Sequence, residues 1–335
     1  RVHDAKGNVY GRNGRYEENG FKYGVPIADL DPTKSYGDYL TFDRQQTMDY
    51  DGVGNRKTMV DAITGGATDT YEYNRPAGGG AYAADSVNRI YRVRKNGVDQ
   101  DFTYANGNPT SDGTYAFSYD YKNRLIETRL VSDGSLVQGN NYNCFDIRIV
   151  KDFDGTANDV YFYTDGPRVV EERDTSGTVL ATYVHGDWID EVLTMDRGGS
   201  TFFYSQQALY SVVHISDALG NNAEKMQYDG FGKPTVYHWI PAVVGGGGTW
   251  NAVSASLIVN PFMFTGRDYD SATKRNYYRA RDMDPVHGRF TTRDPIPNSL
   301  CRGGDLLNQY TYVLNMPTAL VDPTGESVAG VLWAE

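Results

Sequence analysis

The stretch SVVHISDALGNNAEKMQYDGFGKPTVY (residues 211–237) places two turn signals between short strand-like runs. The turns are DALGNN (217–222) and DGFGK (229–233), and the runs beside them hold Val, Ile, Thr and Tyr, which favour strands. Gly and Asn tolerate the positive φ angle of a tight turn, and an aspartate beside the turn can accept its backbone N–H groups. The stretch therefore predicts consecutive antiparallel hairpins.

The same rhythm extends over much of the chain. Turn signals recur about ten residues apart from residue 160 onward, and no segment shows a sustained helical period. We therefore predict an all-β fold, although the spacing of turns alone is compatible with a propeller, a sandwich or a solenoid. A Tyr-Asp start also recurs, in YDGVGNRKT (50–58), YDYKNRLIET (119–128) and YDGFGKPTVY (228–237).

Composition supports many short, half-buried strands. The 335 residues include 27 Tyr and 37 Gly, while the hydrophobic share is a modest 39%. Tyr suits strands whose ring edge stays wet, and Gly suits turns. The glycine-rich segment 240–257 breaks the pattern and predicts a flexible insertion or an exposed loop. The character of the sequence changes near Asn260.

Charge and special residues exclude several classes of function. The net charge of −11 argues against binding to nucleic acid or to an anionic membrane, and no apolar run approaches the ~18–20 residues of a membrane span. Cys144 and Cys301 are far apart and do not have the spacing of metal ligands, so their pairing stays open. The five histidines show no metal-binding spacing either. We expect no metal and no cofactor. The chain starts in the middle of the pattern, and we expect it to be a fragment.

One segment gathers arginines and aspartates in this acidic chain. YRARDMDPVHGRFTTRDP (278–295) has four arginines interleaved with aspartates around two Asp-Pro steps. Three interpretations compete: a nucleic-acid patch, a catalytic carboxylate site and an ion-paired structural plug. The interleaved aspartates cancel the local positive field, which disfavours the first.

Larger pieces of the sequence resemble the bacterial RHS/YD-repeat proteins, which are also related to teneurin shells. ALYSVVHISDALGNNAEKMQYDGFGKP (208–234) is similar to a repeat segment of that family, with Tyr210 in place of a glycine and Lys233 in place of the usual arginine. NPFMFTGRDYDSATKRNYYRARDMDPVHGRFTTRDP (260–295) and NQYTYVLNMPTALVDPTGE (308–326) resemble the RHS-associated core. The resemblance covers residues from about 40 to 326.

The resemblance implies a hollow β-shell. In that family, a spiral of β-hairpins forms the shell wall, a loop-rich core segment plugs one end, and a variable C-terminal polypeptide, often a toxin, lies inside. By this resemblance residues 1–256 would be a segment of the shell wall, 257–326 the core plug and 327–335 a short tail. The N-terminal repeats would be incomplete.

The family's self-cleavage implies a candidate catalytic site. Arg293 and Asp294 match its arginine-aspartate step, and Asp305 is the candidate for a second carboxylate, although the loop before it departs from the family pattern. Two carboxyl groups in a low-dielectric site can split their pKa values, so that one activates water while the other donates a proton. The cleavage motif maps to Asp322, Pro323, Gly325 and Glu326.

Two departures weaken this interpretation. Glu326 stands where the family has leucine, and only nine residues follow it, which leaves no cargo to release. The structural alternative is that the arginines pair with carboxylates and carbonyl oxygens and so join the plug to the wall, which suits the planar guanidinium group. The residues of this expected ion-pair cluster are Arg279, Arg281, Asp282, Asp284 and Arg289.

The sequence therefore predicts a non-catalytic shell that encapsulates or presents a C-terminal toxin or effector polypeptide, secreted or on the bacterial surface. One alternative is an aspartyl-type autoprotease that cuts near Gly325–Glu326. Another is a surface adhesion or glycan-binding module, because Tyr and Trp on exposed strands could stack on sugars, although such rings more often pair across strands. The expected partners are the C-terminal cargo, other shell segments or glycans, and not nucleic acid.

Overall fold

The chain is β-structured throughout the described residues. The computed structural model describes residues 2–3, 9–10, 15–19, 45–51, 53–61, 68–73, 88–153, 158–207, 209–242, 248–296, 308–326 and 329–330. These residues contain strands, turns and two short 3-10 turns, η4 (Phe264–Gly266) and η5 (Val313–Asn315), but no α-helix. The predicted all-β fold is confirmed. The chain divides into two compact units, residues 1–101 and 102–335.

The first unit is a six-stranded antiparallel sheet in which strands adjacent in sequence are adjacent in space. A separate pair is formed by β1 (Val2–His3) and β2 (Val9–Tyr10). The sheet runs through β3 (Arg15–Asn19), β4 (Gln45–Tyr50), β5 (Arg56–Asp61), β6 (Thr68–Tyr73), β7 (Ile90–Lys95) and β8 (Val98–Asp101).

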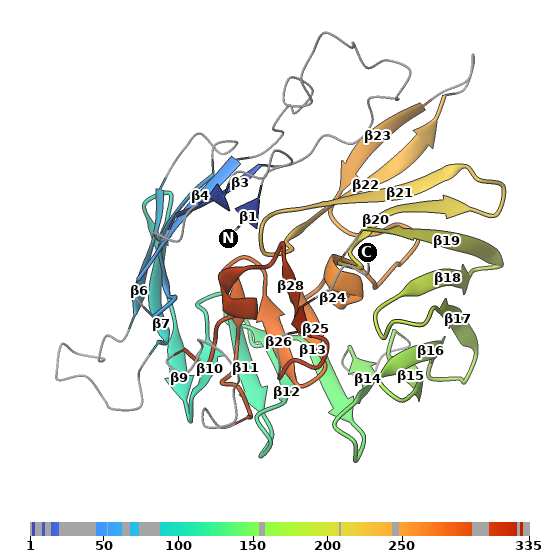
Figure 1. Ribbon diagram of the computed structural model, residues 1–335. Helices are drawn as coiled ribbons and strands as arrows, with labels where there is room; N and C mark the ends of the chain where they lie inside the picture. Colours follow the sequence, from blue (N-terminus) through green and yellow to red (C-terminus); the bar gives the residue numbers. More distant parts are fainter. Residues whose placement is uncertain are drawn as a thin grey trace, which may run out of the picture. The chain divides into compact units, whose positions relative to one another are not determined.

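The second unit is built on one antiparallel sheet of 15 strands, β9 to β23, again in sequence order. This succession of hairpins is what the spacing of turns predicts. In Figure 1 the strands follow one another along a curve. They are β9 (Thr103–Ala105), β10 (Asn108–Ser111), β11 (Tyr115–Tyr119), β12 (Leu125–Leu130), β13 (Leu136–Tyr142), β14 (Arg148–Asp152), β15 (Val160–Asp165), β16 (Arg168–Arg173), β17 (Val179–His185), β18 (Val192–Arg197), β19 (Ser200–Gln206), β20 (Val212–Asp217), β21 (Asn222–Tyr228), β22 (Pro234–Pro241) and β23 (Gly248–Val253).

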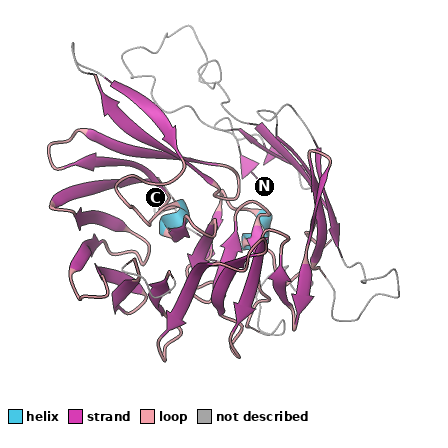
Figure 2. Ribbon diagram, turned by 180° about the vertical axis from the view of Figure 1, so that it is seen from behind, coloured by secondary structure: helices cyan, strands magenta, loops and turns pink. Residues whose placement is uncertain are grey.

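The remainder of the second unit, residues 254–296 and 308–326, is here called the inner segment. It lies within the curve of the 15-stranded sheet, and its two 3-10 turns are visible there in Figure 2. Its contacts reach from β10 to β22, because Tyr310 donates to the Gly107 carbonyl and Phe264 packs against Gly232. It contains β24 (Asp268–Asp270), β25 (Arg275–Tyr278), β26 (Arg281–Asp284) and β27 (Arg289–Phe290), followed by β28 (Leu320–Val321), which pairs with β29 (Ala329–Gly330).

Aspartates close the hairpin turns in a repeated way. Oδ1 of Asp229 accepts the backbone N–H groups of Phe231 and Lys233, at 3.1 and 2.8 Å. Gly232, three residues after the aspartate, has φ +86°, which a side chain would strain. The Tyr-Asp repeat thus encodes a capped turn, and the same pair of N–H bonds is accepted by Asp51, Asp120, Asp174 and Asp217.

Tyr210 occupies the equivalent left-handed position in another turn, where the family pattern has glycine. Its φ is +61°, and its N–H donates to the Gln207 carbonyl at 2.8 Å. A non-glycine residue in this conformation is strained by about 1 kcal/mol. The Tyr210 ring stacks on Trp188 with a centroid distance of 5.6 Å and an interplanar angle of 10°, which offsets the strain.

We therefore expect Tyr210→Ala to destabilise the protein more than Tyr210→Gly does. The alanine variant loses the stacking and keeps the strained backbone, at a cost of about 2 kcal/mol, whereas glycine loses the stacking and relieves the strain. Urea unfolding of both variants and the parent measures the difference. Equal loss in the two variants would contradict the assigned strain.

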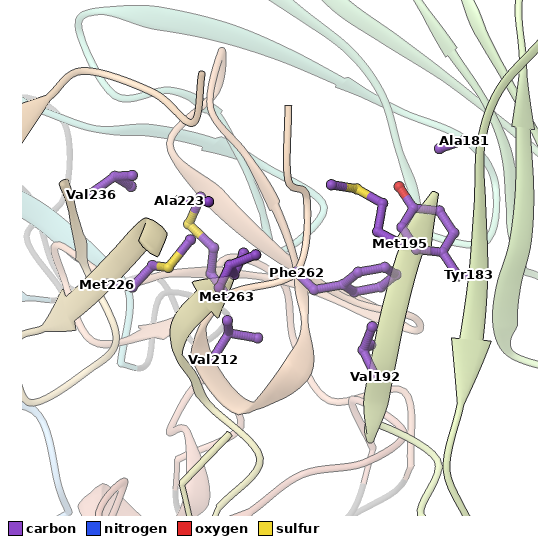
Figure 3. Packing of buried hydrophobic residues seen from close by; sticks show 11 residues of the cluster. Ala181, Tyr183, Val192, Met195, Val212, Ala223, Met226, Val236, Phe262 and Met263 are labelled. Carbon is purple, nitrogen blue, oxygen red and sulfur yellow. The ribbon is translucent and has the colours of Figure 1, made fainter. Parts of the chain in front are cut away.

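A hydrophobic core joins the sheet to the inner segment. Phe262 packs edge to face on Tyr183 with a centroid distance of 5.0 Å, and the Val212 N–H donates to the Met263 carbonyl at 3.0 Å. Burial of these large apolar groups is the main stabilising contribution here. Figure 3 shows the cluster: Ala181, Tyr183, Val192, Met195, Val212, Ile215, Ala223, Met226, Val236, Phe262 and Met263.

The prediction of a flexible insertion or loop at 240–257 is wrong for part of that segment. Gly248–Val253 forms β23 and pairs in register with β22, with Trp239 opposite Trp250. The two indole rings pack at a centroid distance of 4.9 Å, and Lys225 lies 5.1 Å from the Trp250 ring. A cross-strand aromatic pair therefore extends the sheet beside the glycine run.

Candidate functional site

Arg281 lies at the centre of the carboxylate site. Its side chain is 3% exposed and belongs to the first residue of β26. Its guanidinium lies 3.0 Å from Asp294 and 3.4 Å from Asp322, and it stacks 3.5 Å from the Phe290 ring centroid. Its Nε donates to the Gly325 carbonyl oxygen. One buried cation thus joins two carboxylates to the backbone of the cleavage motif.

Residues 322–326 are held by their own aspartate and by arginines. Oδ1 of Asp322 accepts the N–H groups of Gly325 and Glu326, at 2.8 and 3.2 Å. Arg267 donates to the Asp322 carbonyl at 3.0 Å, and Arg279 donates to the carbonyl of Pro323. Together with Arg281, three arginines fix this short stretch of backbone.

Gly325 cannot be replaced without moving that backbone. Its φ is +79°, and a Cβ atom added there would lie 2.1 Å from the Tyr278 carbonyl oxygen. A backbone atom cannot yield at that distance, so the glycine of the motif is sterically required.

The acidic groups of the site influence each other's protonation. Burial raises the pKa of Asp294 above its ordinary value, Arg281 opposes the shift and Asp322 adds to it. Burial also raises the pKa of Glu326, and the nearby charge of Asp294 raises it further. A raised pKa lets a carboxyl group keep its proton at a higher pH, which a general acid in the cleavage of a peptide bond needs.

The structure brings together some of the residues expected at a catalytic site. Asp294, Asp322, Pro323, Gly325 and Glu326 lie around Arg281. The ion-paired arginine beside Asp294 is Arg281 from β26. The expected Arg293 packs instead against the turn at Gly107, where an added Cβ would lie 3.0 Å from its Nε. Asp305 and Cys301 lie outside the described residues.

The other members of the expected ion-pair cluster have separate partners. Arg279 pairs with Asp190, in the loop after β17, at 2.9 Å. Asp284 contacts Nδ1 of His287 at 2.7 Å, and the Arg289 guanidinium lies 4.9 Å from the Tyr310 ring centroid. The carbonyl of Asp282 accepts the N–H of Thr291.

Sequence reasoning missed a cluster of buried ion pairs on β14. Arg148 in β14, with a side chain 1% exposed, contacts Asp270 at 2.6 Å and Asp268 at 2.7 Å. Lys151 contacts the same two carboxylates, and the Arg148 guanidinium lies 4.1 Å from the Tyr277 ring centroid. The sequence did hold a signal for Arg148. Side chains of a strand alternate between its two faces, so RIVKD (148–152) places Arg148 on the same face as the buried Val150.

Asp282 gives the stability of the folded protein a dependence on pH. Burial raises its pKa to about 6, assisted by the nearby charges of Asp270 and Asp268. The folded protein therefore binds this proton more tightly than the unfolded chain does. As the pH rises from about 4 to about 6, the buried Asp282 must lose its proton and become charged, which lowers the free energy of unfolding.

We expect Asp282→Asn to raise the free energy of unfolding by about 2–3 kcal/mol at pH 7 and to leave it nearly unchanged at pH 4. Urea unfolding at both pH values tests this. Asp284→Asn is the matched comparison. Burial alone would raise the pKa of Asp284, but His287 outweighs burial and holds that pKa well below its usual range. The Asp284→Asn variant should therefore lose stability at pH 7. A loss of stability in Asp282→Asn at pH 7 would contradict the assignment.

No family model matches this chain, but its sequence is similar to those of known proteins. This chain is similar to a segment of the WapA proteins. It is 29% identical over 281 residues to the tRNA3(Ser)-specific nuclease WapA of Bacillus spizizenii, covering 83% of the chain and 11% of that protein. Its match to the tRNA nuclease WapA of Bacillus subtilis strain 168 has the same identity and coverage. The chain thus spans about a tenth of the length of these relatives.

Solved structures show a looser similarity. The crystal structure of TcdB2-TccC3-Cdc42 superposes with a TM-score of 0.49 at 14% identity, covering 86% of this chain and 17% of that one. Within the described part of the present chain, no helix has the length and apolar character needed to cross a membrane.

Proposed function

We propose that this chain is a segment of a bacterial RHS/YD-repeat shell, secreted or on the cell surface, which encloses or presents a C-terminal polypeptide. The observation that supports this most is the attachment of the inner segment to the concave side of the sheet. The attachment is made by buried ion pairs at separate strands: Arg275 with Asp112 near β10, Arg148 with Asp270 at β14 and Arg279 with Asp190 after β17.

Such attachments hold the inner segment in one arrangement against the sheet. Breaking a buried pair leaves an uncompensated charge, so the inner segment separates from the wall only at a high cost. The WapA relatives are named as tRNA nucleases, and this chain matches about a tenth of their length. We assign to this chain the role of carrying and enclosing a C-terminal polypeptide. We assign nuclease activity to other parts of such proteins.

Protease protection in the natural full-length protein tests the enclosure. Residues that follow Glu326 should resist a broad-specificity protease in the native protein and become at least tenfold more sensitive in Arg148→Met, which breaks the attachment at β14. Arg173→Met is the control, because Arg173 pairs with Glu171 on β16 and is not buried by the inner segment. Rapid digestion of those residues in the native parent would contradict enclosure.

A second candidate function, self-cleavage near Gly325–Glu326, is favoured by the position of Arg281. Its Nε donates to the Gly325 carbonyl oxygen, where negative charge would develop during attack, while the same guanidinium pairs with Asp294. Asp294 as the carboxylate would take a proton from water, the hydroxide would attack the Gly325 carbonyl carbon, and a protonated neighbouring carboxyl would supply the proton to the departing amine. Intact mass measurement of the purified chain detects the two fragments.

A further inference from the structure

A cleft beside the carboxylate site is lined by four arginines and is here called the arginine cleft. It lies between strands β14 to β18 and the inner segment. Its apolar walls include Ile147, Phe162, Val169, Ile189 and Phe262. The arginines are Arg148, Arg168, Arg267 and Arg279.

The charge of the cleft is positive in a chain that is acidic overall. Two aspartates, Asp190 and Asp268, line it beside the four arginines, so the lining carries two positive charges in excess, four minus two. Asp190 pairs with Arg267 and Arg279, at 3.1 and 2.9 Å. A positive recess with low-dielectric walls attracts an anion strongly.

Several polar groups of the lining still have hydrogen-bonding capacity. The Nε atoms of Arg148 and Arg267 and Nδ1 of His185 are buried and have no hydrogen-bond partner among the described residues. Nε2 of His185 lies 2.8 Å from the Val169 carbonyl, so the proton of the neutral ring belongs on Nε2, and Nδ1 can donate to a carboxylate only when the ring is protonated. Arg168 is half-buried, and one of its terminal nitrogens donates to the Asp187 carbonyl at 2.9 Å.

We propose that the arginine cleft binds a carboxylate carried on an apolar stem. The recess has a volume of about 40 Å³, enough for a carboxylate group beside the guanidinium groups, and the stem would lie along the aliphatic and aromatic walls at its open side. A group with one negative charge fits the modest positive excess better than a multiply charged phosphate would. The ligand is either a free carboxylic acid or an acidic residue of a polypeptide. The cleft shares Arg148, Arg267 and Arg279 with the contacts that hold the inner segment and residues 322–323 in place.

Binding of 3-(4-fluorophenyl)propionate to the full chain, followed by fluorine NMR, tests the proposal. We expect saturable binding of the acid and at least tenfold weaker binding of its uncharged amide. N-acetyl-Phe-Glu-amide and its Gln analogue form the peptide arm. Tighter binding of the Glu peptide than of the free acid identifies a polypeptide ligand, and the reverse order identifies a small carboxylic acid. Equal binding of acid and amide, or no binding of any carboxylate, overturns the proposal.

Two variants locate the binding in the cleft. Arg168→Gln should weaken binding of the acid at least tenfold, whereas Arg173→Gln, in the same strand but paired with Glu171 outside the cleft, should leave it unchanged. Ile189→Glu supplies a carboxylate to the cleft from within the chain and should also prevent binding. Thermal unfolding shows which variants are folded, and unchanged affinity in both folded cleft variants refutes the site.

Discussion

Replacing Arg148 by methionine should lower the free energy of unfolding of the second unit by about 3–5 kcal/mol. The side chain is 1% exposed and contacts both Asp268 and Asp270. Methionine fills much of the same volume, but it leaves two carboxylates in a buried place without their principal partner. Lys151 is the cation that remains beside them.

The electrostatics of Asp270 explain the size of this effect. Burial alone would raise its pKa, but Arg148 and Lys151 outweigh burial and hold the pKa well below its ordinary value. The folded state is therefore stabilised by the charged carboxylate only while the cations are present. Removing Arg148 reverses that balance, so the cost should fall at acidic pH, where the carboxyl groups can be protonated.

Urea unfolding at pH 7 measures the loss, and a quadruple variant separates charge from packing. Arg148→Met and Lys151→Met combined with Asp268→Asn and Asp270→Asn remove all four charges of the cluster. This variant should recover most of the stability, because buried ion pairs replaced by neutral groups cost little. Arg173→Met, at a half-exposed pair on β16, should have little effect. A quadruple variant as unstable as Arg148→Met would show that packing, rather than charge, is responsible.

The fold could be predicted from local signals because each hairpin is closed by its own residues. Asp229 and Gly232 belong to one turn, and their roles need no distant partner. The same reasoning failed at 248–253, where a glycine run precedes a strand whose pairing depends on the neighbouring β22. Local composition indicates a loop there, but the cross-strand contact of Trp239 with Trp250 decides the structure.

The site could be predicted only in part because its members come together through tertiary packing. Asp294 and the motif at 322–326 were identified by resemblance. The cation beside them was expected to be Arg293, the residue immediately before Asp294. Arg281, in β26, is ion-paired with Asp294 and contacts Gly325. The segment holds several arginines, and nothing in the neighbouring sequence shows which of them pairs with Asp294. Arg148 was missed for the same reason, since its carboxylates lie about 120 residues away in sequence.

Glu326→Leu should increase the rate of self-cleavage near Gly325–Glu326 at least tenfold, a change of about 1.4 kcal/mol in the barrier. Glu326 adds a third carboxyl group beside Asp294 and Asp322, and the charge of Asp294 raises its pKa. The Glu326 carboxylate is an additional base, and it can take up the proton that the reaction must deliver to the departing amine. Leucine removes that competition and restores the apolar residue that the resembling family has at this position.

The nature of the catalyst is tested within the Glu326→Leu background. Asp294→Asn should slow the cut by about 100-fold or more, because an amide cannot take the proton of the attacking water. Arg281→Lys keeps a positive charge but loses the planar group that contacts both Asp294 and the Gly325 carbonyl, so it should also be slow. Asp165→Asn, at an exposed hairpin end, is the control. The fragments are followed by intact mass over several days. If Glu326→Leu yields no fragment, or if Asp294→Asn leaves the rate unchanged, Asp294 is not a catalytic residue, and the ion pairs around Arg281 serve only to hold the inner segment in place.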